Sequence, residues 1–298
     1  MNTSQTYHDD QTRSARDGPG PTRERPARLA PSSRYRHPGD VIRLIGAGLI
    51  LIVSLAVVAV APSQLVGADA SSVTWLGYDP AGRLLAAPGR DAAVAAVAVL
   101  LTVGVFAAVR EHGTLTSIQR LDDGWLRLMV SGRTPPLIAI AKVFNILGLV
   151  YVTLPARIAV AGLLALRRRW WQLAAFTAAV VVSEVLIGLL KGIYDRPRPP
   201  GSLVVTTGTS FPSGHAVAAS VTVVAAVIAL APPGRRRAWW VLAAMAFSIL
   251  MGLSRAYLGA HWLSDAVAGI LLGTSCAVVT ALMVGQIQRH AERRQRPA

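Results

Sequence analysis

The sequence predicts an all-α protein, a polytopic transmembrane helical bundle of six or seven spans, and three observations support this fold class. First, 53% of the 298 residues are apolar and only 15% are charged, a balance that does not fit a soluble domain. Second, several apolar runs approach the length of about 20 residues that a helix needs to cross a bilayer. Third, short arginine-rich loops separate the later runs. We therefore expect the membrane bilayer to be a partner of this chain.

The first 40 residues are rich in Ser, Thr, Pro, Gly, Arg and Asp and show no apolar periodicity. This composition predicts a disordered tail of the cytoplasmic type over residues 1–40. The first apolar run, 44–61, follows the tail. Ala59-Val60-Ala61 resembles a cleavage site, so a signal peptide is the alternative to a first span, although the preceding tail is longer than a usual n-region.

The remaining apolar runs all predict helices; they are 92–109, 137–166, 171–190, 216–231, 238–253 and 263–284. The run 137–166 is unusually long, and we expect Pro155 to kink or break it. We divide the chain into the tail, a segment of apolar runs and loops over 41–130, a core over 131–285, and a basic C-terminal tail over 286–298.

The arginine-rich segments predict the orientation of the spans. The loops 167–169 and 235–237 and the C-terminal tail are expected on the cytoplasmic side. The connections 192–215 and 254–261 then lie on the extracytoplasmic side. Seven spans would place the arginine-rich N-terminal tail outside, against its charge. Either one of the first two runs is re-entrant or interfacial, or the tail is exported.

The formal net charge of +15 does not predict a nucleic-acid partner, because the arginines lie in the N-terminal tail and beside apolar runs. Cys276 is the only cysteine, which excludes a disulfide within one chain and a cysteine-based metal site. Outside the motifs described next, no cluster of carboxylates or histidines has metal-ligand spacing, so we expect no metal and no cofactor. The oligomeric state stays open.

The first motif begins at the end of the run 171–190, where Lys191 and Arg198 flank a short turn stiffened by prolines. Two cations in this position suit an oxyanion. The alternative is a pair of interfacial cations that snorkel toward water. Only Lys142 and Lys191 among the 30 basic residues are lysines, so a lysine here departs from the strong preference of this chain for arginine.

The second motif is the segment 210–215, Ser-Phe-Pro-Ser-Gly-His, immediately before an apolar helix. Ser213 can cap this helix, and the first amides, near Gly214, point with the helix dipole toward any bound anion. An ordinary N-cap with a glycine turn is the alternative. His215 favours the phosphate site, because an imidazole beside an anion is a candidate general acid.

The third motif contains Arg255, then His261, and then Asp265 one helical turn later. A histidine and an aspartate at i and i+4 share a helix face, so the carboxylate can accept the Nδ1 proton and leave Nε2 free to attack. A buried core histidine is the alternative. The position at a membrane boundary beside an arginine favours a functional role.

Together the three segments resemble the signature of the type 2 phosphatidic acid phosphatase (PAP2) superfamily, which includes vanadium haloperoxidases and bacterial acid phosphatases. The signature elements are Lys-x6-Arg-Pro, Pro-Ser-Gly-His and Ser-Arg-x5-His-x3-Asp, and every fixed position is filled. The resemblance covers about 137–285 and implies a transmembrane bundle with a PAP2-type core. It says nothing secure about the first 130 residues.

The resemblance implies a mechanism. His261 attacks phosphorus and forms a phosphohistidine, Asp265 orients it, and His215 protonates the leaving oxygen. The equatorial oxygens are held by Lys191, Arg198, Arg255 and amides near Ser213 and Gly214. No metal or cofactor is required.

The position of the site at the membrane surface predicts a lipid phosphate substrate, such as a prenyl pyrophosphate, phosphatidic acid or phosphatidylglycerol phosphate. The expected enzyme is a multi-pass phosphatase of the cell membrane with an extracytoplasmic active site. A lipid phosphotransferase that uses an alcohol acceptor is one alternative, and a non-enzymatic transporter or scaffold is another. A soluble haloperoxidase does not fit the apolar composition. Two charges inside apolar runs, Arg157 and Glu184, are expected to form a buried structural ion pair.

Overall fold

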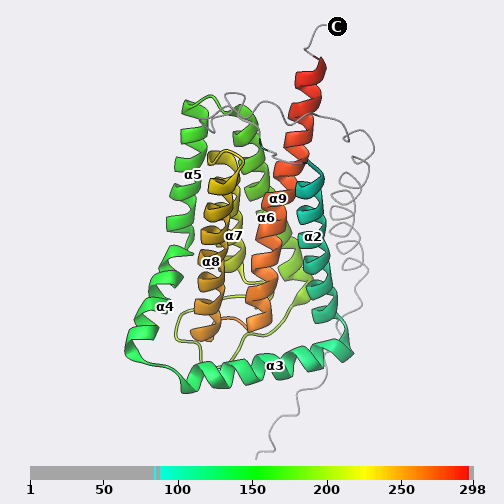
Figure 1. Cartoon of the computed structure of the whole chain (residues 1–298). Helices are drawn as coiled ribbons and strands as arrows, with labels where there is room; N and C mark the ends of the chain where they lie inside the picture. Colours follow the sequence, from blue (N-terminus) through cyan, green and yellow to red (C-terminus); the bar gives the residue numbers. More distant parts are fainter. Residues whose placement is uncertain (1–83, 85–87, 295–298) are drawn as a thin grey trace, which may run out of the picture. The chain divides into compact units, whose positions relative to one another are not determined.

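The computed structural model describes Leu84 and residues 88–294 (Figure 1). These residues form α-helices and no strand, which confirms the all-α prediction. The helices are α2 (Pro88–Arg110), α3 (His112–Ser131), α4 (Pro135–Leu147), α5 (Val150–Leu166), α6 (Trp170–Tyr194), α7 (Gly214–Leu230), α8 (Arg235–Tyr257) and α9 (Leu263–Arg294). The predicted tail 1–40 and the first apolar run, 44–61, lie outside the described residues.

Four of these helices, α2, α6, α8 and α9, are long and apolar enough to cross a membrane. The pair α4 and α5 passes the same test together, which gives up to five spans in the described part of the chain. Helix α7 is apolar but shorter. The predicted six or seven spans are therefore only approximate. Large apolar side chains are exposed on the flanks of the bundle, as a lipid-facing surface requires; they include Leu100, Ile158, Val181 and Trp239.

The long run 137–166 is broken, but not at the predicted place. Pro155 lies inside the continuous helix α5. The chain instead bends by 53° between α4 and α5, at Gly148 and Leu149. A Cβ atom on Gly148 would overlap the ring of His215 from α7. The break therefore lies where the His215 ring approaches the backbone closely, and not at the proline that lacks an amide hydrogen.

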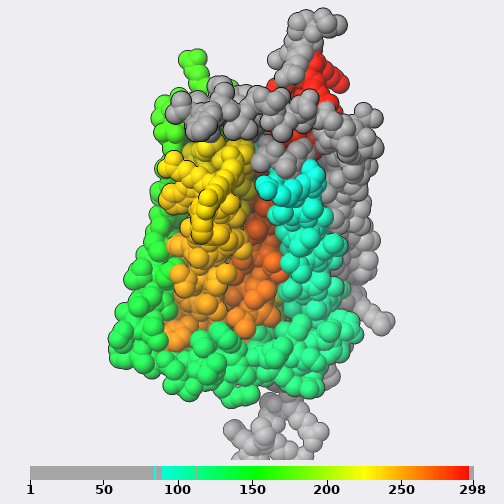
Figure 2. Space-filling model, in the orientation of Figure 1, coloured from blue at the N-terminus to red at the C-terminus, as the bar shows by residue number. Residues whose placement is uncertain are grey.

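Helix α3 was not predicted, because no apolar run marks it. Its sequence is amphipathic, and Glu111 caps its start by accepting a hydrogen bond from the amide of Thr114 at 3.1 Å. In Figure 1, α3 lies across the lower end of the bundle, and Figure 2 shows it as a continuous layer beneath α8 and α9. The helix therefore covers one end of the bundle instead of spanning it.

Helix α7 lies at the centre and packs most closely against α9. Gly269 and Gly273 on α9 face it, and a Cβ at Gly269 would come within 2.7 Å of the carbonyl oxygen of Ser213. Small residues at i and i+4 allow the backbones of membrane helices to approach in this way. This contact brings the start of α7 beside the start of α9, and both starts carry motif residues.

The predicted pair of charges inside the bundle forms. Arg157 Nη1 lies 2.8 Å from Glu184 Oε1, and Arg157 Nε donates a 2.9 Å hydrogen bond to Thr222 Oγ1. The Arg157 side chain is largely buried, but the Glu184 side chain is 50% exposed at the flank of α6. The pair is therefore only partly buried.

Candidate active site

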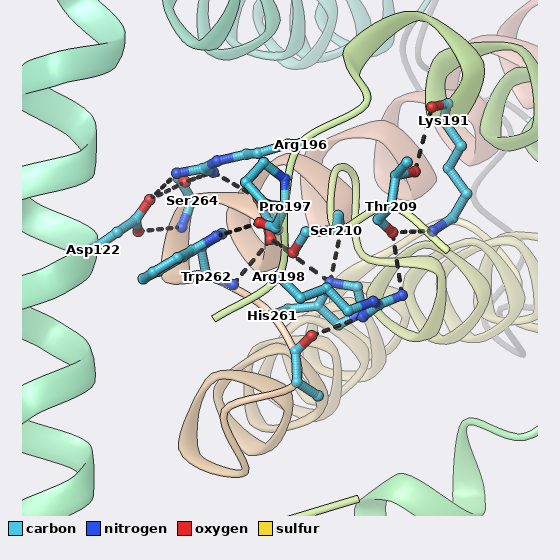
Figure 3. A network of polar contacts seen from close by, with 12 residues as sticks. Asp122, Lys191, Arg196, Pro197, Arg198, Thr209, Ser210, His261, Trp262 and Ser264 are labelled. Carbon is cyan, nitrogen blue, oxygen red and sulfur yellow. Dashed lines mark hydrogen bonds and ion pairs between the residues drawn. The ribbon is translucent and has the colours of Figure 1, made fainter. Parts of the chain in front are cut away.

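The three predicted motifs meet at the end of the bundle that α3 covers. The loop 195–213, which follows α6, lies against the turn 258–262 between α8 and α9; Leu203 donates a backbone hydrogen bond to Leu258, and Ser213 donates one to Asp265. Figure 3 shows the resulting polar network. The arginine-rich loops lie at the opposite end, where Arg169 donates to the carbonyl of Leu230 at 3.2 Å.

The His261 ring has neighbours that fix its tautomer. Nδ1 lies 2.7 Å from the carbonyl oxygen of Ser210, and Nε2 lies 3.1 Å from Arg198 Nη1 (Figure 3). A carbonyl oxygen can only accept and a guanidinium can only donate, so the proton of the neutral ring resides on Nδ1. Nε2 therefore carries a lone pair that faces a cation, which is the arrangement a nucleophile toward phosphorus needs.

Asp265 contacts this histidine less directly than we expected. Its Oδ2 lies 3.7 Å from His261 Nδ1, beyond hydrogen-bond distance, because the Ser210 carbonyl takes the Nδ1 proton. The carboxylate instead accepts a short hydrogen bond from the Ser210 hydroxyl and one of 2.9 Å from the Trp262 amide. Asp265 thus fixes the two backbone segments that hold the ring.

Burial changes the acid–base behaviour of His261, whose side chain is 3% exposed. Loss of hydration lowers the pKa of His261 from 6.5 to about 4, an effect that the nearby Asp265 opposes and that Arg255 and Arg198 increase. The ring is therefore neutral at physiological pH, and Nε2 is unprotonated before an anion arrives.

Within the described part of the chain, Arg198 bonds only to uncharged partners. Its guanidinium donates to the carbonyl oxygens of Ala260 at 2.7 Å, Thr207 at 2.8 Å and Gly208 at 2.9 Å, besides its contact with His261. Lys191 is held in the same way by the carbonyl of Thr209 at 3.0 Å. Both side chains are partly exposed. Two cations with no carboxylate in hydrogen-bond contact are available to an anion.

The segment 213–215 lies at the start of a helix as predicted, but the predicted capping hydrogen bond is not formed. Ser213 is the N-cap of α7, yet its side chain makes no capping hydrogen bond, and its amide donates to the Asp265 carbonyl at 3.0 Å. Ser213 Oγ and His215 Nε2 are both buried and have no partner among the described residues. A buried polar atom without a partner costs about 1–3 kcal/mol, so both suit contact with a polar ligand.

Arg255 lies on the last turn of α8 and is 3% exposed. Its Nη1 makes a short hydrogen bond to Asn145 Oδ1 of α4, and its Nε has no partner within the described residues. Arg255 Nε, Ser213 Oγ and His215 Nε2 are three such atoms; the first is on α8 and the other two are at the start of α7. In the described residues no three His, Cys, Asp or Glu side chains gather as a possible metal site.

This arrangement of a histidine with an unprotonated Nε2, two cations without carboxylate partners and a helix start agrees with a comparison with known families. The PAP2 superfamily matches residues 170–289, which contain all three motifs. The chain thus resembles the PAP2 superfamily over the part that holds the candidate site. Phosphatidylglycerophosphatase B of Bacillus subtilis is 26% identical over 162 residues, which are 53% of this chain and 80% of that protein. Lipid A 1-phosphatase of Rhizobium etli is 33% identical over 124 residues, 38% of this chain and 50% of that protein.

The fold is shared with a solved structure, the transmembrane PAP2 type phosphatidylglycerolphosphate phosphatase of Bacillus subtilis. The TM-score is 0.54 with 22% sequence identity, over 68% of this chain and 97% of that one. The match to the PAP2 superfamily and the relatives named as phosphatases support a phosphatase of the PAP2 type, and the apolar helices support a membrane protein.

Three residues of this site were not predicted as site residues: Asn145, which holds Arg255, Ser210, which holds His261, and Arg196, which contacts Asp265. Asn145 carried no sequence signal, because it lies in an apolar run outside the three motifs. Arg196 lies inside the first motif, but its partner Asp122 is 74 positions away in the sequence.

Proposed function

We propose that the chain hydrolyses the phosphate or diphosphate group of a membrane lipid through a phosphohistidine on His261, without a metal ion. The geometry of His261 carries the proposal. Nδ1 is bound to the Ser210 carbonyl, and Nε2 faces Arg198 with its lone pair. An unprotonated Nε2 beside a cation that has no carboxylate partner supports attack on a phosphoryl group that the cation holds.

The first step moves the phosphoryl group from lipid to protein. The Nε2 lone pair forms the P–N bond while the P–O bond to the lipid breaks. Burial lowers the pKa of His215 to about 3 in the free protein, so His215 takes up its proton together with the bound phosphate and gives it to the leaving oxygen. The equatorial oxygens are bound by Lys191, Arg198, Arg255 and the Ser213 hydroxyl. The ring becomes cationic, and Asp265, 3.7 Å from Nδ1, stabilises that charge.

The second step returns His261 to its starting state. A water oxygen attacks phosphorus, His215 accepts the water proton, and the P–N bond breaks. His215 thus acts first as acid and then as base. Gly214 is the first residue of α7, so its amide and the helix dipole add a favourable field for an anion at this helix start.

A lipid is the best-supported substrate class. The site lies at one end of a bundle whose flanks expose large apolar side chains, so a headgroup can reach His261 while its tails stay in the bilayer. The relatives named phosphatidylglycerophosphatase B and lipid A 1-phosphatase support the same class. We place the enzyme in the cell membrane with its site on the extracytoplasmic face, because the arginine-rich loops at the other end favour the cytoplasm.

The test is phosphate release by detergent-purified protein from phosphatidylglycerol phosphate, phosphatidic acid and a prenyl pyrophosphate, with EDTA present. We expect release from at least one lipid by the wild type and none by His261→Ala. Asp123→Asn, which alters a carboxylate outside the site, serves as a matched control and should stay active. Turnover that survives in purified His261→Ala, or that EDTA abolishes, would contradict the proposed mechanism.

A further inference from the structure

Arg196 lies two residues before Arg198 but points away from the phosphate-binding side. Its side chain is 6% exposed and makes four hydrogen bonds, of which Figure 3 shows those to Asp122 and Ser264. Nη1 donates to Ser264 Oγ and to Asp265 Oδ1, each at 2.7 Å. Nη2 donates to Gln119 Oε1 and Asp122 Oδ2, also at 2.7 Å each. This arginine therefore joins the covering helix α3 to the start of α9.

Asp122 is the anchor on α3. It is 2% exposed, and besides Arg196 it accepts hydrogen bonds from the Ser264 amide at 2.9 Å and the Ser264 hydroxyl at 2.5 Å. Buried charges of this kind are tolerated only when their hydrogen bonds are complete. Asp122 and Asp265 accept hydrogen bonds from the two terminal nitrogens of one planar guanidinium. A displacement of α3 is therefore expected to displace Asp265.

The network continues from Asp265 to the reacting atom. Asp265 Oδ1 is held by Arg196, while Oδ2 accepts from the Ser210 hydroxyl and the Trp262 amide. The Ser210 carbonyl in turn binds His261 Nδ1 at 2.7 Å. The Arg196 guanidinium also lies over the Trp262 ring, 5.5 Å from its centroid. Each contact in this series fixes the next.

We propose that Asp122 and Arg196 are positioning residues, through which α3 holds Asp265, Ser210 and so the His261 ring in the orientation for attack. The proposal rests on the proposed function of His261. Neither residue touches the substrate, since their polar contacts point into the junction of α3 with α9. Their loss is expected to lower the rate of the chemical step and to leave substrate binding nearly intact.

The magnitude follows from the sensitivity of phosphoryl transfer to alignment. A misplacement of about 1 Å caused by a change away from the chemistry can cost on the order of 100-fold in rate. Asp122→Asn keeps the shape of the side chain but removes its charge, and its amide nitrogen cannot accept a hydrogen bond. Arg196 Nη2 is then poorly paired. We expect kcat to fall about 10-fold in Asp122→Asn and about 100-fold in Arg196→Gln, with KM within about threefold of the wild type.

The experiment compares four variants of the full chain in detergent with the lipid that the wild type hydrolyses best. They are Asp122→Asn, Arg196→Gln, Arg196→Lys and the control Asp123→Asn. Asp123 is the next residue on α3; among the described residues it accepts a hydrogen bond only from Gln119 Nε2, at 2.9 Å, and an asparagine oxygen can retain this bond. Arg196→Lys keeps the charge and should recover part of the lost kcat. Thermal unfolding and gel filtration identify variants that fail to fold.

The outcomes separate this proposal from the proposed function. Reduced kcat with nearly unchanged KM in folded Asp122→Asn, together with normal Asp123→Asn, supports the positioning role even if Arg196→Gln does not fold. A folded Asp122→Asn with the kcat of the wild type overturns it, and so does a raised KM at unchanged kcat. Activity that persists in His261→Ala would instead overturn the proposed function.

Discussion

Arg196 and Arg198 have the same residue type, stand two positions apart and each precede a proline, yet they have opposite surroundings. Arg196 is buried and bonded to the carboxylates of Asp122 and Asp265. Arg198 is partly exposed and bonded to backbone carbonyls and to His261 Nε2. The charge of Arg196 is compensated within the protein, whereas that of Arg198 is not.

The difference shows that the partners of an arginine, and not its place in a motif, determine its role. Desolvation disfavours the charge of Arg198 and lowers its pKa below the ordinary value of an arginine. A guanidinium that is partly desolvated and bonded only to neutral groups gains strongly from a phosphate dianion. Arg196, already paired on both sides, gains nothing from the substrate and stabilises the structure around it.

The largest expected effect is that of Arg198→Gln. Removal of one donor to a developing oxyanion typically costs about 10²–10³-fold in kcat, and loss of a charge that binds the ground state also raises KM. We expect kcat/KM to fall by about 10³-fold or more, and competitive inhibition by inorganic phosphate to be lost. Steady-state kinetics with a phosphate titration measure both effects.

Arg196→Gln is the matched comparison for this measurement. It should keep the inhibition constant of the wild type for phosphate while its kcat falls. If phosphate inhibited Arg198→Gln as well as the wild type, Arg198 would not bind the anion, and the contrast between the two arginines would be wrong.

A second prediction concerns His215, which contributes to the chemistry but not to the Arg196 network. A general acid contributes about 10²–10⁴-fold, and its contribution shrinks when the leaving group needs no proton. In His215→Ala, kcat should therefore fall about 100-fold or more with a lipid phosphate and much less with an activated aryl phosphate. Equal decreases in kcat with both substrates would show that His215 is not the general acid. In Arg196→Gln, kcat should fall by similar factors with both substrates.

The pH profile tests the environment that Arg198 creates. Because burial holds the pKa of His261 near 4, the neutral ring persists down to that pH and is protonated below it. The acid limb of kcat/KM for the free enzyme should lie near pH 4 and not near 6.5. In the unfolded chain the ring takes up its proton near 6.5, so acidification from 6.5 to 4 should also lower stability. An acid limb at pH 6.5 would contradict the burial of the His261 ring, because that is the value of a hydrated histidine.

Gly148→Ala should give a smaller effect on the His215 side of the site. The added Cβ would overlap the His215 ring, so either the ring or the bend between α4 and α5 must shift. Overpacking of this kind costs about 1–3 kcal/mol, and displacement of His215 should lower kcat about 10-fold. Gly162→Ala on α5, where a Cβ meets nothing within 4 Å, is the control and should behave as the wild type. Identical behaviour of the two variants would rule out a close packing of His215 on this bend.

The smallest effect is expected at the ion pair of Arg157 with Glu184, which is remote from both arginines of the loop. Glu184 is half exposed, and an amide oxygen can still accept from Arg157. Glu184→Gln should lower stability by about 1 kcal/mol or less and leave kcat unchanged. Thermal unfolding in detergent measures the change. A loss of activity in the folded variant would assign the pair a role in catalysis.

The sequence was sufficient for the helices that cross the membrane and for the family, because apolar runs and contiguous motifs are local signals. It failed at the break in 137–166, which lies at Gly148, where the ring of His215 from another helix approaches the backbone, and not at Pro155. Helix α3 was missed because it is amphipathic without an apolar run. The pairing of Asp122 with Arg196 and the Nδ1 contact with the Ser210 carbonyl are products of tertiary packing, which no spacing in the chain encodes.

The central claim is that His261 carries the phosphoryl group. Wild-type protein incubated briefly with a lipid labelled with ³²P in the reacting phosphate, and quenched with denaturant, should retain label that is stable to base and released by acid. Arg196→Gln should form the same adduct more slowly, and His261→Ala should form none. Absence of acid-labile label in the wild type at all quench times, or its presence in His261→Ala, would contradict the account.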